Sequence, residues 1–210
     1  MTTSIRSDFD VETSTTAFGF NLPQRAGRLL WGPMLVMALM AFPVGLLIAG
    51  VRATTIQQGG DAATVAALGQ FGPAVMFIGF AAVFAAVTFS IARILGTLRN
   101  GSGLVQQAAG GTVQALRMLP TAKAFIGLMM MAMMILVGAV IAHFVIGAAI
   151  LGGDASALGS AETWAIRLEA VRRIGVVLYL VAIVLGLATI AEVIRFQAIR
   201  LRELAAEAAR

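Results

Sequence analysis

Cysteine is absent from the sequence, histidine occurs once, and charged side chains are scarce. The absence of cysteine excludes disulfides, thiolate metal sites, iron–sulfur clusters and a cysteine nucleophile. Charged residues make up 12% of the chain, about half of the roughly 25% found in soluble proteins. This number of charges cannot cover the surface of a water-soluble protein of 210 residues. We therefore expect the bilayer to be the solvent for much of the chain.

Apolar residues, in contrast, form 60% of the sequence, and the mean hydropathy is +0.94. A helix needs about 20 apolar residues to cross a hydrocarbon core of about 30 Å. Four runs meet this requirement, and they are too long and too continuous for the alternating strands of a barrel. We therefore predict an all-α, polytopic membrane protein with a bundle of four transmembrane helices over residues 29–51, 71–95, 124–151 and 174–194.

Polar segments flank and connect these four runs. Residues 1–28 are expected to form a polar cytoplasmic segment ahead of a retained first anchor, and residues 195–210 a charged helical cytoplasmic tail. Helical spacing of apolar residues in 105–119 and 160–171 predicts two short amphipathic helices at the membrane surface, the second of them capped by Ser160. Trp31 and Trp164 are predicted as interfacial anchors.

The distribution of basic residues predicts the orientation. Of the 15 lysines and arginines, eleven fall in the N-terminal segment, the middle connection and the tail. An excess of basic residues marks the cytoplasmic side, so both termini are expected in the cytoplasm of a bacterium, with the chain in the inner membrane. The four basic residues predicted on the opposite side are Arg52, Arg167, Arg172 and Arg173.

Four polar residues inside the apolar runs are candidate site residues: His143, Glu192, Thr88 and Ser90. An ionisable group within a membrane helix is costly and therefore suggests a role. His143 could form an interhelical hydrogen bond, ligate a cofactor such as haem, or handle protons or substrate. Glu192 could pair with Arg195 on the same helix face or line a proton or cation path.

Two short motifs bracket the middle connection: Leu98, Arg99, Asn100 and Gly101, and then Ala115, Leu116 and Arg117. With the four-helix plan, they resemble a class of uncharacterised bacterial four-helix integral membrane proteins. The phenylalanine and asparagine that this class carries between its motifs are not found here. The resemblance implies no catalytic residues.

No catalytic set, metal-ligand cluster or nucleotide motif can be assembled from the sequence. We therefore expect a non-enzymatic assembly, accessory or regulatory subunit of a membrane complex, without cofactor or metal. Its expected partners are the lipid bilayer and other membrane subunits or further copies of the chain, not nucleic acid. One alternative is a small oligomeric transporter or channel, with the four polar positions lining its path. A less favoured alternative is a haem- or quinone-binding redox subunit built around His143.

Overall fold

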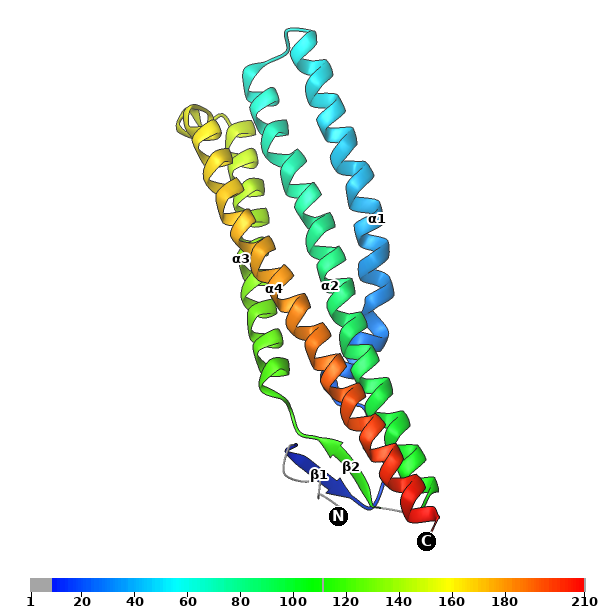
Figure 1. The fold of residues 1–210 in the computed structure, drawn as a ribbon. Helices are drawn as coiled ribbons and strands as arrows, with labels where there is room; N and C mark the ends of the chain where they lie inside the picture. The colour runs from blue at the N-terminus through cyan, green and yellow to red at the C-terminus, as the bar shows by residue number, and fades with distance from the viewer. Residues whose placement is uncertain (1–8, 111, 210) are drawn as a thin grey trace. The chain divides into compact units, whose positions relative to one another are not determined.

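Four long helices dominate the computed structural model, which describes residues 9–110 and 112–209 (Figure 1). Each contains an apolar stretch long enough to cross a membrane, which is typical of a multi-pass membrane protein. The first eight residues of the predicted polar segment, Gly111, and Arg210 at the end of the predicted tail lie outside the described residues. In chain order the helices are α1 (Leu22–Gln57), α2 (Ala62–Ala108), α3 (Pro120–Leu151) and α4 (Ala155–Ala208).

Every helix contains its predicted apolar segment, and three of them extend far beyond it. The extension is greatest in α4, whose 54 residues include both the fourth apolar segment and the predicted helical tail. Alanine, leucine, arginine and glutamate are all strong helix formers, so the helix continues into sequence that hydropathy excludes. The chain thus keeps the same secondary structure where its surface becomes charged.

Two tight turns connect consecutive helices, and both contain a glycine with a positive φ and a capping aspartate. α1 ends at Gln57 and is followed by Gly59, whose φ is +67°. α2 starts directly after Asp61, whose carboxylate accepts a 3.0 Å hydrogen bond from the backbone N–H of Thr64. α3 is followed by Gly153, with a φ of +85°, and then by Asp154. A positive φ suits glycine, and an aspartate directly afterwards caps the next helix.

The two predicted amphipathic helices are wrong as separate elements. Residues 160–171 are an internal part of α4, which begins at Ala155 and is capped by Asp154, whose carboxylate accepts the backbone N–H of Ser156 at 2.9 Å. Ser160, the predicted cap, instead donates to the carbonyl of Ser156 within the helix. In residues 105–119, α2 continues to Ala108 and the chain then leaves the helix at Gly110, with a φ of +75°.

A small sheet replaces the predicted helix there, so the fold is not entirely α-helical. Strand β1 (Val11–Ser14) pairs antiparallel with strand β2 (Val113–Leu116), with Glu12 opposite Ala115. Glu12 of β1 forms an ion pair with Arg99 of α2, and Asp10, the residue before β1, forms an exposed ion pair with Arg117 at 3.5 Å. The polar N-terminal segment is therefore part of the fold from its first described residues.

The side chain of Gln106 binds the other edge of β2. Its Oε1 accepts the backbone N–H of Gln114 at 2.8 Å, and its Nε2 donates to the carbonyl of Gln114 at 3.0 Å. Gln106 is 1% exposed, and the buried Arg200 of α4 donates to the same Oε1 at 3.4 Å. Arg200 in turn pairs with Glu203 and Glu207, so the helical tail supports the sheet.

The contacts divide the chain into two units, each with its own packing. One comprises the described parts of residues 1–31, 87–126 and 182–210, including the sheet; the other comprises residues 32–86 and 127–181. Figure 1 shows β1 and β2 beside each other in the first unit. In the second unit the core is built by Ala132, Leu136 and Tyr179, with Phe84 stacked on Tyr179 at 4.4 Å between ring centroids.

Candidate functional site

His143 lies in α3 within the second unit and is only 2% exposed. Its Nδ1 is 2.7 Å from Oε1 of Gln70 on α2. Gln70 is equally buried, and its Nε2 donates to the carbonyl of Ala161 on α4 at 2.9 Å. Because the amide nitrogen of Gln70 donates to this carbonyl, the amide oxygen of Gln70 faces His143 and must accept a hydrogen bond from it. The proton of the imidazole is therefore on Nδ1. One histidine and one glutamine thereby connect three helices.

Phe77 lies about two turns after Gln70 on the same face of α2, and its ring contacts His143 and Arg172. Its ring stacks on His143 with 6.3 Å between centroids and an interplanar angle of 19°. The guanidinium carbon of Arg172 lies 3.8 Å from the centroid of the same ring. Arg172 also forms an ion pair with Glu169, one turn earlier on α4. An aromatic face accommodates a cation well where water is scarce.

Glu192 forms a second polar cluster, in the first unit. Its Oε2 accepts a 3.3 Å hydrogen bond from the hydroxyl of Thr121 at the start of α3. The hydroxyl of Thr121 is also 3.1 Å from that of Thr189, which is 3% exposed. The predicted pairing of Glu192 with Arg195 is not among the ion pairs of the described residues. Glu192 therefore connects α4 to α3 instead of bonding within its own helix.

The four predicted polar positions are divided between the two units. Thr88, buried in α2, and Ser90, half-buried beside it, belong to the same unit as Glu192. His143 belongs to the other unit and contacts Gln70 and Phe77.

Both predicted anchor tryptophans lie against arginines. The ring of Trp31 is 5.1 Å from the guanidinium of Arg93 on α2, and that of Trp164 is 5.4 Å from Arg167 on the same helix. Trp164 is also exposed. A tryptophan with an arginine over its face suits the headgroup level of a bilayer, where one end of the side chain is apolar and the other is hydrated.

The chemistry of these clusters is hydrogen bonding between helices. Within residues 9–110 and 112–209, no three histidine, aspartate or glutamate side chains lie close enough to hold a metal ion. The ring of His143 is fixed by an amide oxygen on one side and an aromatic face on another. Polar pairs of this kind position helices in an apolar surrounding, where an unpaired polar group would be costly.

Sequence reasoning missed Gln70, the partner of His143. It lies one residue before the predicted apolar segment 71–95, so it was not among the polar positions inside the apolar runs. Gln70 and Phe77 are seven residues apart, which places them on one helix face. That spacing was the available signal, because a buried amide near the end of an apolar helix needs a partner in another helix.

Comparisons with protein-family models, curated proteins and solved structures find no match for this chain. Function must therefore be argued from the residues and contacts described above.

Proposed function

We propose that this chain is a non-enzymatic integral membrane protein that serves as an assembly, accessory or regulatory subunit of a membrane complex in a bacterial inner membrane. The observation that supports this proposal is that most of the surface of α1 is exposed. Only 17% of the apolar stretch of α1 is buried within the chain, against 44% of the apolar stretch of α2. A membrane helix with so few contacts inside its own chain has most of its surface available to another helix.

The packed side of α1 is a narrow seam in each unit. Its buried positions are Gln24 and Gly27 in the first unit, and Ala38, Ala41 and Gly45 in the second, with three- or four-residue steps of one helix face inside each set. Most of these residues are small, which lets the backbones of α1 and α2 approach closely.

The exposed side of α1 is continuous and apolar. Val36, Leu39, Met40 and Leu47 are between 60% and 68% exposed. Lipid can cover such a face, and so can a helix of another membrane subunit. The buried polar groups support a structural role, because His143, Gln70 and Glu192 are all hydrogen-bonded to other helices of the chain. We infer that recognition, not catalysis, is the function of this surface.

Purification in mild detergent followed by mass spectrometry tests this proposal. We expect foreign membrane subunits in stoichiometric amounts with the unmodified chain. The variant Leu39→Trp, which adds a large ring to the exposed face of α1, should retain roughly tenfold less of them, because poor packing costs about 1–3 kcal/mol.

Val184→Trp is the matched control, since Val184 is a 64% exposed apolar residue on α4. This variant should retain the partner at the level of the unmodified protein. A preparation containing this chain alone, or an equal loss in both variants, would refute the proposal.

The proposed orientation places both termini in the cytoplasm, on the strength of the eleven basic residues in the N-terminal segment, middle connection and tail. Alkaline phosphatase folds into its active form only outside the cytoplasm, so its fusion after Arg210 should be inactive. Fusion after Gly153, in the turn between α3 and α4, should be active. Activity in the opposite pattern would reverse the topology.

A further inference from the structure

The second unit contains a cavity of about 930 Å³ between α1, α2 and α4. This volume is at the upper end of the roughly 300–1,000 Å³ typical of small-ligand sites. Its apolar walls include Met76, Phe80 and Phe84 of α2. Four of the lining residues are charged and all others are apolar or glycine, so polar contacts are confined to a few positions.

Those four charged residues are Arg52 of α1 and Glu169, Arg172 and Arg173 of α4. Glu169 forms ion pairs with both Arg172 and Arg173. The guanidinium of Arg52 donates from Nε to the carbonyl of Val65 at 3.3 Å, and it has no carboxylate partner within the described part of the chain. The lining thus holds three guanidinium groups and one carboxylate, and the cavity carries an excess of positive charge.

The backbone leaves room for the guanidinium of Arg52 beside α2. A Cβ atom on Gly69 would lie 3.3 Å from the guanidinium carbon of Arg52, so glycine permits this close approach. Farther along α2, the guanidinium of Arg172 lies over the ring of Phe77, 3.8 Å from its centroid. Both arginines are therefore held at the cavity by neighbouring residues, with other N–H groups left to bind a ligand.

The apolar walls of the cavity continue onto surface that faces away from the chain. Leu46 of α1 and Val177 of α4 both line the cavity, and they are 65% and 58% exposed. In a membrane helix, such exposed apolar residues meet acyl chains. A hydrocarbon chain can therefore pass from the bilayer into the cavity without crossing a polar barrier.

We propose that this cavity binds a single anionic phospholipid, with its phosphate at Arg52, Arg172 and Arg173 and an acyl chain along Met76, Phe80 and Phe84. Arginine forms paired, charge-assisted hydrogen bonds with phosphate oxygens, and basic pockets between membrane helices bind lipid headgroups. The excess of positive charge selects an anionic lipid, and the apolar walls select an amphiphile over free phosphate. This inference does not depend on the proposed assembly function.

Native mass spectrometry of the full-length protein can test the proposal. Protein purified in mild detergent is incubated with phosphatidylglycerol or with phosphatidylcholine of the same acyl chains, or with inorganic phosphate. We expect one bound phosphatidylglycerol, at least about tenfold weaker binding of phosphatidylcholine, and no displacement by inorganic phosphate. Removing one charged hydrogen-bond donor should weaken binding by roughly tenfold or more, so Arg52→Gln and Arg172→Gln should each lose phosphatidylglycerol.

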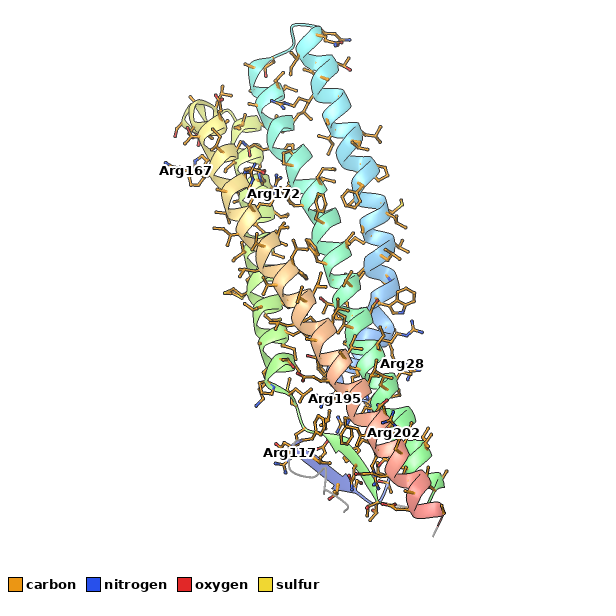
Figure 2. All side chains as sticks on the ribbon, in the orientation of Figure 1. Arg28, Arg117, Arg167, Arg172, Arg195 and Arg202 are labelled. Atoms are coloured by element: carbon orange, nitrogen blue, oxygen red, sulfur yellow. The ribbon has the colours of Figure 1, made fainter. Side chains whose placement is uncertain are left out.

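Arg167→Gln is the matched control for charge. Figure 2 shows Arg167 on the outside of α4 and Arg172 among the helices, and only Arg172 lines the cavity. Arg167→Gln should bind phosphatidylglycerol as the unmodified protein does. Equal binding of the two lipids, or an equal loss in Arg167→Gln and Arg172→Gln, would overturn the proposal.

A second pair of variants tests the acyl chain while all arginines stay in place. Ala49 lines the cavity, whereas a side chain added at the adjacent Gly50 would meet nothing within 4 Å. Ala49→Trp should therefore weaken binding of phosphatidylglycerol by roughly tenfold, and Gly50→Trp should not. Unchanged binding in Ala49→Trp would show that the lipid does not occupy this cavity.

Discussion

Replacing Gln106 with leucine should release strand β2 and lower the local stability of the sheet by about 2–5 kcal/mol. The N–H and the carbonyl of Gln114 both bind the side chain of Gln106, at 2.8 and 3.0 Å. Leucine has a similar size but offers neither partner. Each buried backbone group left without a hydrogen bond costs about 1–3 kcal/mol, and Arg200 also loses its 3.4 Å contact.

Hydrogen exchange measures this effect at single amides. In Gln106→Leu, the amide of Gln114 and its neighbours in β2 should exchange at least about 30-fold faster than in the unmodified protein. Gln107→Leu is the control, because Gln107 is the exposed neighbour whose side-chain oxygen accepts the N–H of Ala17 at 3.3 Å and does not contact β2. Protection of β2 that survives in Gln106→Leu would show that the sheet does not depend on this side chain.

The four membrane-length helices could be predicted because hydropathy reports directly on burial in lipid. Their ends could not, because hydropathy does not measure helix propensity. The charged tail was predicted to be helical, and Glu203 and Glu207 do lie in α4, but the start of α4 at Ala155, far before the apolar segment 174–194, was not predicted. Asp154 was the usable signal for the start of α4, since an aspartate directly after two glycines favours a helix cap.

The sheet could not be predicted because its two strands are about a hundred residues apart in the sequence and only four residues long. Its contacts are non-local, and a segment such as Val113–Leu116 has too few residues to separate strand from helix by periodicity. Instead, the apolar spacing across residues 105–119 favoured a helix. The two Gly residues at 110 and 111 were the contrary signal.

One residue of the candidate site, His143, could be predicted from the sequence, but its partners could not. His143 stands out because it is the one ionisable side chain within the third apolar segment. Its contact with Gln70 depends on the rotation of α2 and α3 about their axes, which the sequence of each helix alone does not determine. The motif residue Arg99 illustrates the same point, since its ion pair with Glu12 joins segments that hydropathy treats separately.

Gly27→Ala should destabilise the protein by about 2–3 kcal/mol, the upper part of the range for added atoms in a packed core. A Cβ atom at Gly27 would lie 2.6 Å from the carbonyl oxygen of Phe89 and 3.0 Å from the backbone nitrogen of Arg93. Both are backbone atoms of α2, so no side-chain rotation can relieve the contact. The two helices would have to separate along the seam that holds α1.

Two other glycines of α1 make this prediction specific. At Gly45 a Cβ atom would also come within 2.6 Å of a neighbour, but that neighbour is the sulfur of Met76, a flexible side chain that can move. At Gly32 the added atom would meet nothing within 4 Å. Because alanine is favoured over glycine inside a helix by about 0.5–1 kcal/mol, Gly32→Ala should be neutral or slightly stabilising.

Reversible unfolding in mixed detergent would rank the three variants, with the lowest stability for Gly27→Ala and the highest for Gly32→Ala. The ranking separates the effect of helix propensity from the effect of close contact between α1 and α2. Helix propensity alone predicts the same gain at all three positions, whereas close approach of α1 and α2 predicts a loss that grows with the rigidity of the contacted atom. Equal stability of Gly27→Ala and Gly32→Ala would therefore show that α1 does not pack on α2 at this seam.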